Sequence, residues 1–181
     1  MLKMNESVKM IVTLIVIAVV VALALSGVNG LTKAKIEQNS VDKLNKSLQE
    51  VMVADSYDVI KDDETGTVYE AKKGGETVGY CVQNTVSGYG GDLTVLTGVY
   101  ADGTVSKVEI LAHGETPGLG AKSTDDSFKG QYVGKTAGEI TVVKNSPDVQ
   151  DIQAISGATI TSNAVTAAVN QARDCIKEAT K

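Results

Sequence analysis

The chain has 181 residues, of which 43% are apolar and 22% charged, and this composition suits one ordinary globular domain with an additional segment. Its net charge of −5 argues against nucleic acid as a partner, because a phosphate backbone requires a basic face. With one histidine and no CxxC pair, the two cysteines predict no metal site. Cys81 and Cys175 either form a disulfide outside the cytoplasm or are two separate core thiols.

The N-terminal segment is long and apolar. Residues 10–25 read MIVTLIVIAVVVALAL, and no charge occurs between Lys9 and Lys33. As a helix, this uncharged stretch can cross a hydrocarbon core of about 30 Å. We expect a cytoplasmic tip and an uncleaved membrane anchor over residues 1–31. A signal peptide is the alternative, but the apolar run exceeds the usual apolar region of about 7 to 15 residues. Lysines flank both ends, so charge does not orient the span.

The next segment, residues 32–66, is predicted to be an amphipathic helix followed by a connector. Residues 32–54 carry apolar side chains at helical spacing. A helix that packs on its own domain is favoured over a coiled coil, because the heptad pattern is short. The apolar stripe consists of Ile36, Leu44, Leu48, Val51 and Met52.

From residue 67 the sequence changes to short runs rich in β-branched residues and tyrosine. The runs TVYEAKK, ETVGYCVQNTV, DLTVLTGVYA and TVSKVEILAH are separated by Gly-Gly, SGYGG and Ala-Asp-Gly. Such turns predict an antiparallel meander. A Gly- and Asp-rich loop, a strand candidate EITVVK and a helix over 163–178 follow. The predicted fold class is therefore α+β: an N-terminal transmembrane helix, then a twisted antiparallel sheet with flanking helices in a domain over 67–181.

The stretch DIQAISGATITS, residues 151–162, concentrates hydroxyl groups just before the final helix. Ser and Thr at a helix start can cap free N–H groups, and Gly157 permits a sharp entry. Capping accounts for one or two of the four hydroxyls. The N–H groups and dipole of a helix N-terminus also favour an anion, phosphate above all. A threonine hydroxyl at this point could therefore hold a phosphate or carry one covalently.

The motif SGATITS resembles the flavinylation motif of the FMN-binding domain family, in which FMN is joined to a threonine by a phosphoester bond. An ApbE-type flavin transferase makes that bond in the family. A second block, AHGETPGLGAK over 112–122, resembles the H-x-E-T-P-G-L-G loop of RnfG and NqrC proteins. A third, GYGGDLTVLTGV over 88–99, is also similar. The three blocks occur in the family's order, and together with the apolar helix they are most similar to RnfG.

The resemblance implies that FMN is attached to Thr159 and that the motif residues bind it. Glu115 and Thr116 would hydrogen-bond the ring or ribityl chain, and Lys122 would approach the phosphate. His113 is either a plain loop residue or a tuning group near the flavin. The other implied FMN-binding residues are Ser156, Gly157, Ala158, Thr161, Ser162, Gly118, Leu119 and Gly120.

The same resemblance implies a single-pass electron-transfer flavoprotein of the cell membrane, with its C-terminal domain outside the cytoplasm. It would carry electrons in an Rnf-type complex that couples ferredoxin oxidation and NAD reduction to Na⁺ or H⁺ export. Its partners would be other membrane proteins of that complex, the flavin transferase and membrane lipid. No catalytic side chain is expected, because the flavin carries the chemistry.

Two alternatives belong to other classes of protein. The first is an anchored extracytoplasmic binding domain without flavin. The second is a flavin-dependent reductase of a soluble acceptor. The sequence contains neither a nucleotide-binding GxGxxG turn nor an iron–sulfur cysteine set, which counts against a self-contained reductase.

Overall fold

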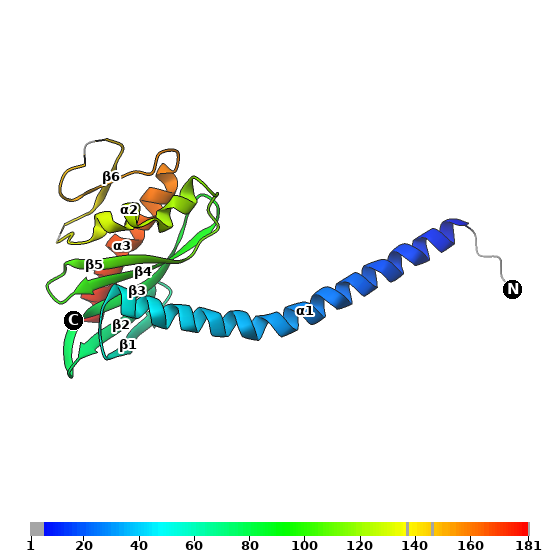
Figure 1. Ribbon diagram of the computed structural model, residues 1–181, viewed down its shortest axis with the longest axis horizontal. Coiled ribbons are helices and arrows are strands. Elements are labelled where there is room, and N and C mark those ends of the chain that lie inside the picture. The colour runs from blue at the N-terminus through cyan, green and yellow to red at the C-terminus, as the bar shows by residue number, and fades with distance from the viewer. Residues whose placement is uncertain (1–5, 137, 146, 181) are drawn as a thin grey trace. The chain divides into compact units, whose positions relative to one another are not determined.

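The computed structural model describes residues 6–136, 138–145 and 147–180. The chain falls into two units, the first ending at Lys43 and the second beginning at Leu44. Helix α1 (Glu6–Val51) continues through this boundary without interruption (Figure 1). Within α1, Val8–Gly30 is long and apolar enough to cross a membrane, and its side chains are exposed to solvent. The amphipathic segment predicted over 32–54 is therefore the continuation of this helix, and the side chain of Ile36 lies outside the described residues.

The second unit contains a five-stranded antiparallel sheet in which each strand pairs with its neighbours in sequence. This confirms the predicted meander and the α+β class. Gly74 and Gly75 join two strands with φ angles of 61° and 88°, as a type I′ hairpin turn requires. The first strand of the sheet lies in the segment 32–66, where the sequence predicted only a connector after the helix. The strands are β1 (Ser56–Asp63), β2 (Gly66–Lys73), β3 (Glu76–Ser87), β4 (Asp92–Tyr100) and β5 (Val105–Ala112).

The C-terminal end of α1 covers one face of this sheet. A β-carbon at Gly98 would lie 2.4 Å from Cγ1 of Val51, and one at Gly79 would lie 2.7 Å from Cε of Met52. The two glycines therefore let the helix approach the strands closely. The Ser106 hydroxyl also donates a 2.8 Å hydrogen bond to the carbonyl of Val51. The cluster on this face includes Leu48, Val51, Met52, Ala54, Ala71, Cys81 and Leu96.

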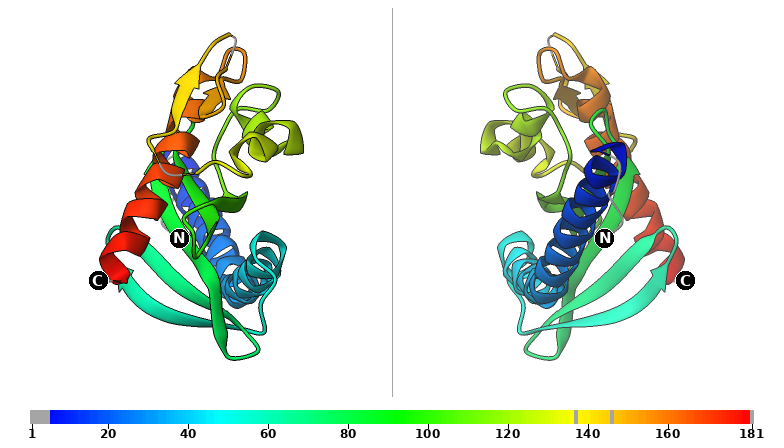
Figure 2. Two further views of the ribbon diagram at one scale, coloured as in Figure 1. Left: turned by 90° about the vertical axis from the view of Figure 1, so that its left-hand side faces the viewer. Right: turned by 90° about the vertical axis from the view of Figure 1, so that its right-hand side faces the viewer.

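Helix α3 (Thr159–Ala179) covers the opposite face (Figure 2). Neighbouring residues of β4 point to opposite sides, so Val95 joins the cluster with α3 while Leu96 joins the cluster with α1. The amide of Asn84 donates a 2.9 Å hydrogen bond to the carbonyl of Ala168 and ties β3 to the helix. The helix begins at Thr159 instead of residue 163. The sheet residues in contact with α3 include Val68, Val82, Val95 and Val99.

Cys81 and Cys175 are both buried and free, and they belong to different clusters. In this structure they are therefore two separate core thiols. Burial raises the pKa of the Cys81 thiol to about 12, because the charged thiolate is unfavourable in the core.

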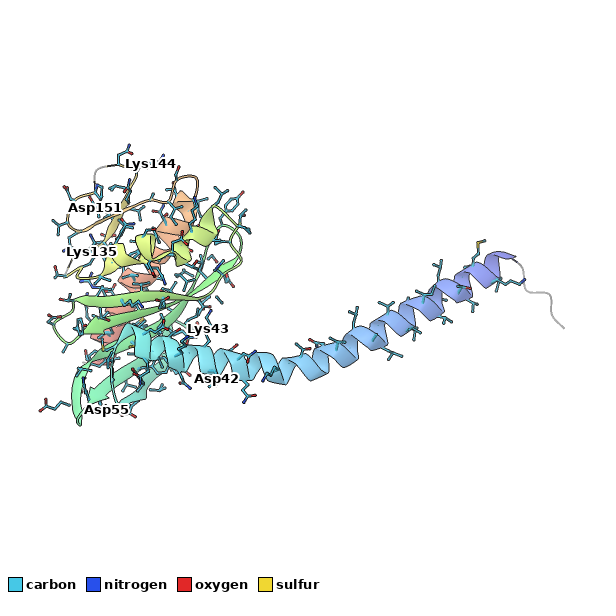
Figure 3. The ribbon with its side chains drawn as sticks, viewed as in Figure 1. Asp42, Lys43, Asp55, Lys135, Lys144 and Asp151 are labelled. Atoms are coloured by element: carbon cyan, nitrogen blue, oxygen red, sulfur yellow. The ribbon has the colours of Figure 1, made fainter. Side chains whose placement is uncertain are left out.

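The segment between β5 and α3 contains short elements. These are η1 (Gly120–Thr124), α2 (Asp126–Lys129), η2 (Gly130–Tyr132), β6 (Thr141–Val143) and β7 (Asp151–Gln153). The strand predicted from EITVVK is confirmed as β6, which pairs in parallel with β7. The ammonium group of Lys135 donates hydrogen bonds to the carbonyls of Val149 and Asp151. Figure 3 labels the side chains of Lys135 and Asp151. Lys135 therefore ties the start of β7 to the rest of the segment.

Candidate functional site

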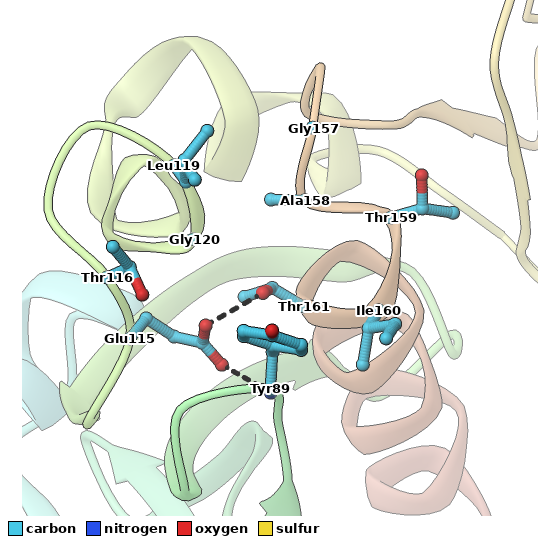
Figure 4. Close-up of a pocket in the computed structure, with 10 residues that line it drawn as sticks. All are labelled: Tyr89, Glu115, Thr116, Leu119, Gly120, Gly157, Ala158, Thr159, Ile160 and Thr161. Carbon is cyan, nitrogen blue, oxygen red and sulfur yellow. Dashed lines mark hydrogen bonds between the residues drawn. The ribbon is translucent and has the colours of Figure 1, made fainter.

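A pocket of about 410 Å³ opens where three connections of the second unit meet (Figure 4). They are the β3–β4 turn, the loop after β5 and the entry to α3. The volume lies in the range of about 300–1,000 Å³ that is usual for small-molecule sites. Its lining residues are Tyr89, Glu115, Thr116, Leu119, Gly120, Gly157, Ala158, Thr159, Ile160 and Thr161.

Three large side chains at the pocket are exposed to solvent. Tyr89 is 72% exposed, Ile160 56% and Leu119 45%, although each carries apolar surface that a domain normally covers. One comes from each of the three connections. An aromatic ring and two aliphatic side chains around a concave site can cover a planar aromatic ligand.

The carboxylate of Glu115 lines the pocket and joins the three connections. One oxygen, Oε1, accepts hydrogen bonds from the backbone N–H groups of Tyr89 at 2.8 Å and Gly90 at 3.3 Å. The other, Oε2, accepts one from the hydroxyl of Thr161 at 3.0 Å. Both oxygens act as acceptors, which is the pattern of an ionised carboxylate. Glu115 is only 6% exposed, so it fixes the pocket walls from behind.

Two glycines leave the space that this carboxylate fills. A β-carbon at Gly120 would lie 2.3 Å from Oε2 of Glu115, and one at Gly88 would lie 2.2 Å from Oε1. No real β-carbon tolerates either distance, so these positions require glycine if the carboxylate is to stay in place. The predicted Gly118 and Gly157 have φ angles of 79° and 78°, in the left-handed region that favours glycine.

The hydroxyl groups of Thr161 and Ser162 do not cap the helix, so the capping alternative does not account for these two residues. Ala158 occupies the N-cap position, and no side chain caps the first turn. Thr161 donates to Glu115, while the Ser162 hydroxyl donates to the carbonyl of Ala158 and accepts from the N–H of Ile155. The first turn of α3 therefore presents N–H groups and a helix dipole that favour an anion.

Thr159 is the first residue of α3 and lies at the rim of the pocket. Its side chain is half-buried and points away from Glu115 and Tyr89 (Figure 4). The hydroxyl is therefore beside the uncapped first turn and outside the centre of the pocket.

The structure brings eight of the predicted site residues together around the pocket and places four elsewhere. Lys122 is exposed and lines a different hollow of about 270 Å³ with Asp125 and Phe128. His113 is exposed, and its Nδ1 accepts a 3.2 Å hydrogen bond from the N–H of Glu115. Among the described residues, no group of acidic, His and Cys side chains could hold a metal ion. The four predicted residues that do not line the pocket are Ser156, Gly118, Ser162 and Lys122.

Tyr89 and Ile160 line the pocket but were not singled out from the sequence. Ile160 follows Thr159 directly, and nothing in its residue type marks it. Tyr89 carries a usable signal, because it is a lone aromatic residue among the glycines of the block GYGG. An aromatic side chain on such a turn is exposed unless a ligand or partner covers it.

Comparison with protein families agrees with this geometry. Residues 88–174 match the FMN-binding domain, and residues 1–51 match the RnfG N-terminal region. The first range contains the whole pocket, and the second coincides with the end of α1 at Val51. The fold and pocket thus define an FMN-binding domain that follows an N-terminal apolar helix.

Individual relatives narrow the family further. The chain is 39% identical to the G subunit of the proton-translocating ferredoxin:NAD(+) oxidoreductase complex of Clostridium ljungdahlii, over 83% of this chain and 80% of that protein. It is also 39% identical to the G subunit of the Na(+)-translocating complex of Acetobacterium woodii, over 87% and 85% of the two chains. The chain belongs to the RnfG family of ion-translocating oxidoreductase G subunits.

A solved structure supports the fold. The crystal structure of the C subunit of the Na(+)-translocating NADH-quinone reductase from Parabacteroides distasonis is 29% identical, with a TM-score of 0.54. The match covers 64% of this chain and 63% of that chain. This agrees with the predicted relationship to NqrC.

Proposed function

We propose that this chain is the electron-carrying G subunit of a membrane-bound Rnf-type complex, with FMN joined to Thr159 by a phosphoester bond. The two relatives from C. ljungdahlii and A. woodii are named for ferredoxin:NAD(+) oxidoreductases that translocate protons and Na⁺. By extension, this chain passes electrons within a complex of membrane proteins that exports one of these ions. Val8–Gly30, the one candidate span among the residues that the structure describes, is its membrane anchor, in contact with lipid.

One observation carries the attachment site: the hydroxyl of Thr159 lies at the rim of the pocket, on the first residue of a helix that no side chain caps. A phosphate on that oxygen would lie beside N–H groups and a dipole that favour its negative charge. The walls of the pocket offer apolar contact for the ring through Tyr89, Leu119 and Ile160. The residues present therefore fit FMN, which supplies the electron-transfer chemistry when bound.

The residues of this chain bind and orient the flavin. Glu115 holds the three connections in register through its hydrogen bonds. Gly157, with its positive φ, lets the chain turn sharply into α3 and leaves Thr159 accessible to a flavin transferase of the ApbE type.

The attachment is tested by expressing the full chain with such a transferase and measuring the mass of the Thr159 peptide. We expect the mass of FMN less one water on the wild-type peptide and no added mass in Thr159→Ala. Ser127→Ala is the control, because it removes an exposed hydroxyl outside the motif and outside the pocket and should keep the flavin. FMN on Thr161, or an unmodified Thr159 in the presence of active transferase, would contradict the proposal.

The orientation that we propose places the second unit outside the cytoplasm. An added cysteine at the exposed Glu76 provides a reporter, since Cys81 and Cys175 are buried. An impermeant maleimide should label Glu76→Cys in intact cells. Labelling only after lysis would place the unit in the cytoplasm.

A further inference from the structure

Glu115 is the only charged residue among the ten that line the pocket. No lysine, arginine or histidine shares the lining, so no cation in the walls offsets its charge. The groups that bind it are two backbone N–H groups and the hydroxyl of Thr161, all of them neutral donors. They stabilise the carboxylate, but its net charge remains.

This charge is shielded from water. Glu115 is 6% exposed, and Gly88 and Gly120 pack against its two oxygens so closely that a β-carbon at either position would collide with them. A ring in the pocket would exclude further solvent from the same wall. Charges in such surroundings interact more strongly than in water, because the local dielectric constant is low.

We propose that Glu115 tunes the flavin by keeping its midpoint potential low, a role that rests on the proposed function. Reduction of the ring takes up two electrons from the electron donor and, at neutral pH, one proton from solvent. The ring therefore gains one negative charge. A buried carboxylate in the adjacent wall opposes that gain, which makes the reduced flavin a stronger electron donor to the next carrier.

Glu115→Gln tests the charge with little change in shape. The amide oxygen can accept from the N–H groups of Tyr89 and Gly90, and the amide nitrogen can donate to the Thr161 oxygen, so the three connections stay joined. We expect the equilibrium constant for two-electron reduction to rise at least tenfold, which is a shift of about 30 mV to more positive potential. The measurement is a dithionite titration of the full-length, flavin-loaded chain in detergent, with dithionite as the electron source and water as the proton source.

Two further variants separate charge from structure. Thr161→Val keeps the charge and removes one of its donors, so the potential should stay at or below the wild-type value. A merely structural role for Glu115 would loosen the walls in both variants and shift both potentials in the same direction. Glu76→Gln makes the same chemical change at an exposed residue at the start of β3, and it should leave the potential unchanged.

The outcomes distinguish this inference from the proposed function. A loaded Glu115→Gln chain with an unchanged or lower potential overturns the role of Glu115 and leaves flavin attachment standing. Wild-type chain without FMN on Thr159 overturns the proposed function itself. If Glu115→Gln fails to fold or to take up FMN, Thr161→Val tests the role of Glu115 instead. A tenfold rise in the equilibrium constant for two-electron reduction of the Thr161→Val chain would overturn that role, because the charge of Glu115 is still present in this variant.

Discussion

Gly120 packs against the carboxylate of Glu115, and a methyl group has no space there. In Gly120→Ala the new β-carbon would lie 2.3 Å from Oε2 of Glu115 and 2.7 Å from Oγ1 of Thr161. If the carboxylate stays, the overpacking costs about 1–3 kcal/mol. If it moves, the lost hydrogen bond to a charged group costs about 1.5–3 kcal/mol. The two routes together predict that the free energy of unfolding falls by about 1–3 kcal/mol.

The assay is thermal unfolding of the full chain in detergent, followed by circular dichroism. At about 4 °C per kcal/mol, the melting temperature should fall by roughly 4–12 °C. Gly130→Ala is the control, because Gly130 has helical angles (φ −60°, ψ −22°) and nothing within 4 Å of an added β-carbon. Its melting temperature should stay the same or rise slightly. A Gly120→Ala chain as stable as this control would refute the reasoning that Glu115 is fixed in place.

Three other outcomes follow from contacts of the second unit. Ser162→Ala should cost about 1–3 kcal/mol, because it leaves the N–H of Ile155 without its partner, while the mass that FMN adds to the Thr159 peptide should not change. Gly98→Ala should lower the melting temperature by overpacking against Val51 without preventing flavin attachment, which mass spectrometry can check. Burial raises the pKa of Cys81 from 9.0 to about 12, so stability is fully present below pH 9 and declines as pH rises toward 12. Cys81→Ala should remove that decline in denaturant titrations.

The meander could be predicted because its turns and strands are local patterns. Gly74 and Gly75 adopt the positive φ angles that a Gly-Gly turn between two strand-like runs predicts. Strand β1 (Ser56–Asp63) was missed because it is an edge strand with exposed residues on both faces, so no alternation marks it. The short β7 was missed as well, because its pairing with β6 is parallel and depends on a distant segment.

Local patterns were less informative about the site. The sequence identified the motifs SGATITS and AHGETPGLGAK, and the structure brings most of the site residues predicted from them to one pocket. It could not show that Thr161 donates to Glu115, since 46 residues separate the two. For the same reason, it could not show that the Glu115 oxygens hold the backbone of Tyr89 and the start of α3. Whether any motif residue also contacts FMN is still a prediction.

The position of α3 in the chain has a consequence for biosynthesis. The five strands pair only with their neighbours in sequence, so the sheet can form as the chain emerges, but the 21 residues that cover one of its faces follow all five strands. Until they arrive, Val68, Val82 and Val99 have no helix to contact. The proposed acceptor, Thr159, opens that same helix. A truncated chain therefore lacks both the covering helix and the hydroxyl, so an incomplete product cannot take up flavin and enter an assembly in loaded form.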